Sequence, residues 1–264
     1  MKRDGREAVP VRYRATVEYD GTDFAGFQIQ PNARTVQGEL EDAVARLSDG
    51  TRRPVDGAGR TDAGVHATGQ VIAFTYAGRL SAQELVEALN GILPRDVALR
   101  DVRRVPAGFH PRHAARYRDY RYTVWNGPRS PLRERTTLSV RAPLDTEAMS
   151  RAGAVLVGRH DFSAFGSPDP QPVRTVHAVR VRREGPLVTI DVRADAFLRG
   201  MVRRIVAVLL EVGKREMNED AVAAALADRR PALNGAAAPA RGLCLRRVVL
   251  GRPQRAGVGA HDRQ

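Results

Sequence analysis

Polar and apolar residues follow one another in a regular order along this chain. Over residues 13–20, Ala15, Val17 and Tyr19 alternate with more polar neighbours, and this period of two predicts a strand. Thr35 suits a helix N-cap, and an apolar stripe at helical spacing follows it. The first ~105 residues continue as two strands, a second helix and a further strand, which is an α+β order.

The rest of the chain divides in the same way. Ser81 and Glu84 match a capping box, which predicts the start of the second helix. Further helices are expected after Asp145 and after Asn218. Another helix is expected over residues 196–212, with apolar side chains on most of its surface. Strands are expected at residues 13–20, 53–58, 70–76, 97–105, 116–126, 173–183, 187–194 and 243–250, and residues 158–172 are expected to form a loop.

Residues 106–112 form the best candidate linker. We therefore expect an N-terminal α+β subdomain over residues 1–108 and a C-terminal α+β subdomain over residues 109–251. The second half repeats the order of strands and helices only loosely, without a sequence repeat. The polar segment 252–264 is expected to be a disordered tail.

The charge indicates the kind of partner. The 264 residues include 43 Lys and Arg against 30 Asp and Glu, a net charge of +13. A balance this basic predicts a polyanionic partner, most simply a nucleic acid. Coding bias is an alternative explanation, because a high genomic GC content enriches arginine and alanine together, and this chain is rich in both.

The arginines are concentrated in two segments. Residues 100–135 contain ten arginines and three acids, and residues 174–204 contain eight arginines and three acids. The first segment also holds Tyr117, Tyr120, Tyr122 and Trp125, and arginines interleaved with aromatic rings can bind phosphates and stack on the bases of looped RNA. An exposed strand with arginines on its solvent face would give the same pattern.

Several classes of protein are disfavoured. The single cysteine, Cys244, excludes an internal disulfide and a cysteine-based zinc cluster, and the histidines show no HxxxH spacing. The sequence has no run of about 18 apolar residues, so it predicts no membrane span. The basic N-terminal segment lacks an apolar core for export, so we expect a cytoplasmic protein.

The glycine-rich stretch GAGRTDAGVHATGQ, residues 57–70, is the most unusual segment of the chain. Small residues packed this densely indicate a sharp turn or a close approach of the backbone to another group. Asp62 is the only carboxylate in the stretch, and Arg60 lies two residues before it. Asp62 is a candidate catalytic group, although an aspartate beside glycine is more often a turn residue that binds its own backbone.

Seven segments resemble, in the right order, the motifs of the TruA family of tRNA pseudouridine synthases. The central one is GRTDAGVHA, residues 59–67. The others are EYDGTDFAGFQIQ (18–30), TVQGELEDAV (35–44), YRYTVWN (120–126), HDFSAF (160–165), FLRGMVRRIV (197–206) and APARGLCL (238–245). The resemblance covers residues 12–250. One departure is Phe27, where the family usually has tryptophan, a conservative change outside the catalytic stretch.

The resemblance implies an isomerase that converts uridine to pseudouridine at positions 38 to 40 of the tRNA anticodon stem-loop, without a metal or an organic cofactor. It implies the pseudouridine synthase fold, two α+β subdomains with an antiparallel or mixed sheet and a basic central cleft, and a homodimer. Asp62 falls on the catalytic aspartate, Tyr120 on the tyrosine that stacks on the target base, and Arg203 on the arginine that pairs with the aspartate. Arg60, placed to help extrude the base, and Arg112 complete the predicted substrate-binding residues.

The residues alone leave four points open. Tyr122 satisfies the strand periodicity as well as Tyr120, and Arg203 lies off the centre of the apolar helix face, where a solvated arginine is the default. The alternative function is a non-catalytic RNA-binding or RNA-chaperone protein on the same scaffold. For the chemistry, one carboxylate could attack C1′ as a nucleophile or remove the 2′ proton to give a glycal.

Overall fold

The computed structural model describes residues 9–233 and 237–251, and the predicted tail 252–264 lies outside this part. The strands are β1 (Val11–Tyr19), β2 (Asp56–Gly57), β3 (His66–Tyr76), β4 (Val97–Arg104), β5 (Ala115–Trp125), β6 (Leu138–Ser139), β7 (Gly158–Asp161), β8 (Val173–Glu184), β9 (Leu187–Ala194) and β10 (Leu243–Leu250). The α-helices are α1 (Val36–Leu47), α2 (Ala82–Ile92), α3 (Pro111–Ala114), α4 (Thr146–Val155), α5 (Met201–Gly213) and α6 (Glu219–Asp228).

Side-chain caps start four of these helices where the sequence predicted them. Ser81 and Glu84 form the full capping box at α2. Thr35, Asp145 and Asn218 accept hydrogen bonds from the backbone N–H groups of Gly38, Ala148 and Ala221, at the starts of α1, α4 and α6. Local chemistry therefore sets these boundaries, because each cap satisfies an N–H group that the helix cannot bond internally.

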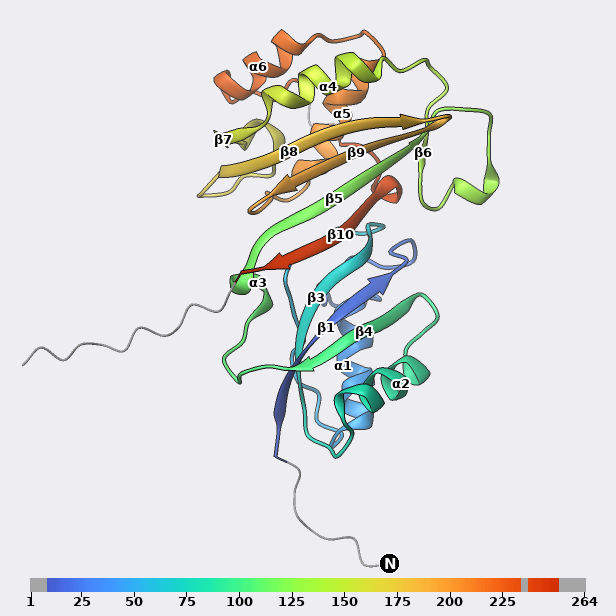
Figure 1. Ribbon diagram of the computed structural model, residues 1–264, viewed down its shortest axis with the longest axis vertical. Coiled ribbons are helices and arrows are strands. Elements are labelled where there is room, and N and C mark those ends of the chain that lie inside the picture. The colour runs from blue at the N-terminus through green and yellow to red at the C-terminus, as the bar shows by residue number, and fades with distance from the viewer. Residues whose placement is uncertain (1–8, 234–236, 252–264) are drawn as a thin grey trace, which may run out of the picture.

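All ten strands of the described chain belong to one mixed sheet, which confirms the predicted α+β class. The order is β4-β1-β3-β10-β5-β9-β8-β7, with β2 beside β3 and β6 beside β5 (Figure 1). The last strand, β10, lies between β3, to which it is parallel, and β5, to which it is antiparallel. The sheet thus runs without interruption through both halves of the chain; the division near residue 108 stays a prediction.

The register defines the two faces of the sheet. Directly paired residues share a face, and the paired row Tyr19, Ala67, Leu245, Tyr120 and Val192 crosses five strands. Every member of this row is at most 8% exposed. The row therefore lies on the face that is covered in the fold, while the neighbouring positions, such as Arg121, face the other way.

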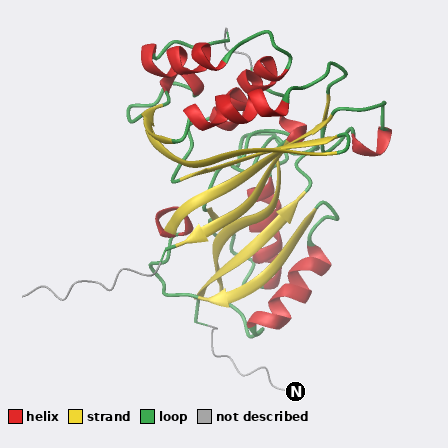
Figure 2. Ribbon diagram, turned by 45° about the horizontal axis from the view of Figure 1, so that its top comes forward, coloured by secondary structure: helices red, strands yellow, loops and turns green. Residues whose placement is uncertain are grey.

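Helices cover the two halves of the sheet separately (Figure 2). In the N-terminal half, α1 packs on β3 and α2 on β4. In the C-terminal half, α4 packs on β8, and α5 and α6 pack against α4. None of the helices in the described residues has the length and apolarity that a membrane crossing requires.

Several predicted boundaries were wrong. Residues 158–172 contain the short strand β7 and a 3-10 turn, η2 (Ser163–Phe165), because backbone pairing with β8 forms a strand too short for alternation to reveal. Helix α5 begins at Met201 and not at residue 196, since Gly200 before it has a φ of 72°, a left-handed conformation. Strand β3 begins at His66, so the glycine-rich stretch is a loop only up to Val65.

Candidate active site

Asp62 lies in the loop between β2 and β3, and its side chain is 32% exposed. The loop rests on the segment that follows β1. The carbonyl of Thr61 accepts a hydrogen bond from the N–H of Phe27 at 3.0 Å, and the N–H of Gly64 donates to the carbonyl of Phe24 at 3.3 Å. Two sequence segments that both resemble the family's motifs are thus hydrogen-bonded to each other on either side of the carboxylate.

Two buried side chains hold the loop from the sheet. Gln70 of β3, which is fully buried, accepts from the N–H of Gly59 at 3.3 Å and donates to its carbonyl at 2.7 Å. The hydroxyl groups of Tyr19 and Thr61 form a hydrogen bond of 2.8 Å. Because buried polar groups without a partner are costly, these contacts fix the residues immediately before Asp62.

The contact between the Asp62 loop and the segment after β1 also requires glycine. Gly26 has a φ of 112°, and a Cβ there would lie 2.9 Å from the carbonyl oxygen of Thr61. A Cβ on Gly57 would lie 2.5 Å from the ring of Phe27. The small size of Gly57 thus makes room for this phenylalanine.

Two guanidinium groups from the far half of the chain face the carboxylate. Arg203, in the first turn of α5, places Nη1 3.6 Å from Oδ2 of Asp62, and Arg199 places Nε 3.9 Å from Oδ1. The Arg203 side chain is 24% exposed and also donates from Nε to the carbonyl of Ala238 at 2.7 Å, whereas that of Arg199 is 83% exposed. Arg203 is therefore held in place, and the expectation of a solvated arginine at this position was wrong.

Tyr120 projects from β5 beside this pair. A Cβ on Gly59 would lie 3.8 Å from its hydroxyl oxygen, and its ring meets that of Phe197 edge to face at 5.1 Å and 86°. Burial raises the pKa of the Tyr120 hydroxyl; the charge of Arg118 opposes this shift and that of Asp62 adds to it. The phenol therefore stays neutral at physiological pH.

Tyr122, which fits the alternation of β5 as well as Tyr120 does, occupies a different environment. It is fully buried, and its hydroxyl donates to the carbonyl of Pro239 at 2.8 Å. A Cβ on Gly242 would lie 2.6 Å from its ring. Tyr122 is thus a packing residue, and of the two tyrosines Tyr120 is the one next to the Asp62 loop.

The remaining predicted substrate-binding residues lie apart from this cluster. The side chain of Arg60 is exposed, and none of the hydrogen bonds or ion pairs among the described residues involves it. Arg112 lies in the short helix α3 and is also exposed; among the described residues its backbone is hydrogen-bonded to the side chains of His110 and Arg118. The structure therefore brings Asp62, Tyr120 and Arg203 together and leaves Arg60 and Arg112 without a contact to them.

Four residues that the sequence did not single out also surround the site: Gln70, Arg118, Phe197 and Arg199. Phe197 and Arg199 belong to the segment FLRG, so the motif contained a signal for them. Gln70 and Arg118 act through backbone carbonyl and N–H groups, which no side-chain pattern reveals.

The histidines do not form a metal site in the described part of the chain. No group of three or more His, Cys, Asp or Glu side chains there could hold a metal ion. Buried His66 instead accepts from the N–H of Gly21 at Nδ1, while Nε2 lies 2.9 Å and 3.1 Å from the carbonyl oxygens of Arg135 and Arg241. It therefore connects three loops.

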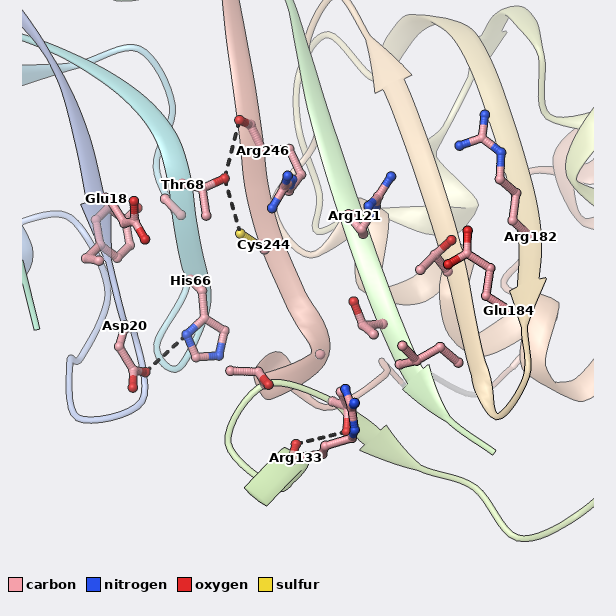
Figure 3. Close-up of a pocket in the computed structure, with 18 residues that line it drawn as sticks. Glu18, Asp20, His66, Thr68, Arg121, Arg133, Arg182, Glu184, Cys244 and Arg246 are labelled. Atoms are coloured by element: carbon pink, nitrogen blue, oxygen red, sulfur yellow. Dashed lines mark hydrogen bonds and ion pairs between the residues drawn. The ribbon is translucent and has the colours of Figure 1, made fainter. Parts of the chain in front are cut away.

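A cavity of about 520 Å³ lies on the opposite face of the sheet (Figure 3). Arg121 of β5 and Cys244 of β10 line it, and Arg121 follows Tyr120 directly, so the two side chains point to opposite faces. Arg121 is already paired with Asp191 through two contacts of 2.7 Å and 2.9 Å. The cavity is thus separated from Asp62 by the sheet.

Comparisons with known proteins agree with this geometry. A family model described as tRNA pseudouridine synthase matches residues 15–113 and 152–249. Proteins named tRNA pseudouridine synthase A are 45% identical over 242 residues in Moorella thermoacetica, covering 89% of this chain and 98% of that protein, and 44% identical over 258 residues in Myxococcus xanthus, covering 95% and 97%. With more than half of the chain matched and identities well above 30%, this protein belongs to the TruA family of tRNA pseudouridine synthases, which are isomerases.

Proposed function

We propose that this protein isomerises uridine to pseudouridine at positions 38, 39 and 40 of the tRNA anticodon stem-loop, with Asp62 as the catalytic carboxylate. The reaction breaks the N1–C1′ bond, turns the base and rejoins it through C5. Nothing is oxidised and no group is released, so the reaction can be completed by protein side chains alone.

One observation carries the proposal. The carboxylate of Asp62, the only one in its loop, faces Arg203 at 3.6 Å and lies beside the Tyr120–Phe197 ring pair. A carboxylate must be ionised to attack C1′ or to take the 2′ proton, and a nearby guanidinium favours the ionised form and orients it. Binding alone would not require a partly exposed acid in a basic site, because an acid repels phosphate.

The aromatic pair supports a role in holding an extruded base. A uridine stacked in a stem-loop must leave the stack before its C1′ can be reached. Stacking on an aromatic ring compensates for the lost base stacking by ~1–3 kcal/mol per base. Tyr120 is held at 5.1 Å from Phe197, so such a platform would be rigid.

The exposed arginines suit contacts with the RNA backbone. Arg60 lies in the same loop as Asp62, and Arg199 faces Asp62 from the segment before α5. Their exposed guanidinium groups are available for phosphates. We assign Arg60 to base extrusion and Arg112 to backbone binding at the α3 turn. The basic central cleft, the homodimer and the cytoplasmic location belong to the same proposal. Light scattering of the purified protein tests the homodimer, and cell fractionation tests the cytoplasmic location.

The proposal is tested with purified protein and three tRNA transcripts, each carrying 5-³H-uridine at only one of positions 38, 39 and 40. We expect tritium release from each transcript with the wild type and none above background with Asp62→Asn, while the variant still binds tRNA. Asp42→Asn, an exposed carboxylate of α1, is the matched control and should stay active.

Two results would reject the assignment. Activity retained by Asp62→Asn would show that another group performs the chemistry. Tight tRNA binding without tritium release by the wild type would instead favour the non-catalytic RNA-binding protein.

A further inference from the structure

Arg118 is a buried cation that binds backbone carbonyl groups. The residue is 9% exposed, and it is flanked in the sheet by Val248 of β10 and Ala194 of β9. Its guanidinium forms no ion pair with a carboxylate of the described residues. Burial lowers the pKa of Arg118, yet an arginine stays charged at neutral pH.

The carbonyl groups come from three segments, two of which carry residues of the site. Nη2 donates to the carbonyl of Ala58 at 2.6 Å, four residues before Asp62. Nη1 donates to the carbonyl of Asp195 at 2.6 Å, two residues before Phe197. Nη2 also reaches the carbonyl of Arg112, at 3.2 Å.

No other side chain among the described residues donates hydrogen bonds to the backbone of both the Ala58 and the Asp195 segments. Ala58 is also hydrogen-bonded to β3, through its N–H and the carbonyl of Val71 at 2.8 Å. Asp195 is also fixed to β8, through hydrogen bonds with Thr175. One side chain of β5 therefore connects the N-terminal half of the sheet, which carries Asp62, with the C-terminal half, which carries Phe197.

The chemistry of the guanidinium suits this task. It is planar and holds five N–H donors in a fixed fork, so one group can bind several carbonyl oxygens at set angles. A lysine at this position would keep the charge but has one mobile ammonium group. A buried hydrophobic residue would fill the volume and leave the carbonyl groups unpaired.

We propose that Arg118 is a positioning residue that sets the distance between the Asp62 loop and the Tyr120–Phe197 platform. This inference rests on the proposed function of Asp62. Arg118 does not touch the substrate; it acts through the backbone of Ala58 and Asp195. The expected effect of its loss is a slower chemical step with RNA binding little changed, since a reacting group displaced by about 1 Å can lose about 100-fold in rate.

The test compares Arg118→Lys with Arg121→Lys, a matched control three residues along β5 on the other face of the sheet. Single-turnover tritium release at saturating enzyme measures the chemical step, and filter binding measures the Kd for tRNA. We expect Arg118→Lys to lower the saturating rate about 30- to 100-fold with a Kd within about threefold of the wild type. Arg121→Lys should leave both values near those of the wild type.

Arg118→Ala adds a readout that a merely structural role would not produce. Its cavity should admit guanidinium ion, so millimolar guanidinium chloride should restore part of the rate, while equal concentrations of sodium chloride or methylammonium chloride should not. A saturating rate of Arg118→Lys within about threefold of the wild type, or a loss explained by Kd alone, overturns the proposal. So does a folded Arg118→Ala without guanidinium-specific recovery; if that variant does not fold, Arg118→Lys decides.

Hydrogen exchange keeps this inference separate from the proposed function. If Arg118 holds both segments, amides of residues 57–64 and 195–200 should exchange faster in Arg118→Lys, with β8 and β9 unchanged. Unchanged exchange in both segments contradicts the positioning role even if the protein is active. An inactive wild type or an active Asp62→Asn rejects the proposed function, and the exchange data still decide whether Arg118 fixes the two segments.

Discussion

Replacing Gln70 by leucine should loosen the Asp62 loop from the sheet. The side chain is fully buried and binds both the N–H and the carbonyl of Gly59, at 3.3 Å and 2.7 Å. Leucine has a similar volume but no polar atoms, so the substitution removes both hydrogen bonds without creating a large cavity. The cost therefore comes mainly from two backbone groups that lose their partner.

The magnitude follows from these two groups. A buried donor or acceptor without a partner costs about 1–3 kcal/mol. Gly59 is only half-buried, so water can compensate in part, and we expect the free energy of unfolding to fall by about 2–4 kcal/mol. For a chain of this size the corresponding decrease in Tm is about 5–15 °C. The protein should still fold, because domains are commonly stable by about 5–15 kcal/mol.

Urea unfolding followed by circular dichroism measures the change, with Gln30→Leu as the control. Gln30 also donates a hydrogen bond to a backbone carbonyl, that of Ala25 at 2.7 Å, but it is exposed, so its loss should cost less than about 1 kcal/mol. Single-turnover tritium release should also slow for Gln70→Leu. If both variants lie within about 1 kcal/mol of the wild type, the two contacts of Gln70 do not hold the loop, and the reasoning fails.

Three further substitutions or treatments test other parts of the structure. Arg203→Met should slow the reaction about 10- to 100-fold and lower the free energy of unfolding by about 1–3 kcal/mol, because it removes the partly solvated ion pair with Asp62 and also leaves the buried carbonyl of Ala238 without its donor; an unchanged rate would contradict a role for the pair. Gly26→Ala forces an alanine to a φ of 112° with its Cβ 2.9 Å from a carbonyl oxygen, so thermal unfolding should show a loss of about 2 kcal/mol or more, and a loss below 0.5 kcal/mol would show that the loop can shift freely. Burial raises the pKa of the Cys244 thiol, so at pH 8 a smaller fraction is thiolate and iodoacetamide should label it more slowly than a free cysteine, with the rate rising toward higher pH; mass spectrometry follows this single thiol, and labelling as fast as in urea would contradict its burial.

The sequence predicted local structure better than contacts between distant segments. Thr35, Ser81 and Asn218 were correctly identified as N-caps, because a cap depends on residues within one turn. Strand β10 was predicted with its observed bounds, yet nothing in its pattern indicated that it lies between β3 and β5. Pairing between strands so far apart depends on the whole sheet, and alternation within one strand does not encode it.

The candidate site shows the same limit. Periodicity placed Tyr120 and Tyr122 on one face of β5 and could not separate them; their contacts do so, because Tyr122 donates to the carbonyl of Pro239 whereas Tyr120 meets Phe197. The helical wheel disfavoured Arg203 because it treats the side opposite the apolar stripe as solvent. In the structure the Asp62 loop approaches that side from the other half of the chain.

The central place of β10 has a consequence for biosynthesis. Strand β3 leaves the ribosome ~170 residues before β10, a delay of about 10–30 s at usual translation rates. During that time the edge of β3 that β10 later joins lacks its native partner, and so does the corresponding edge of β5 once that strand has been made. Such edges can pair with other chains, so the nascent protein should depend on holding chaperones, and overexpression should yield aggregates that form before release from the ribosome.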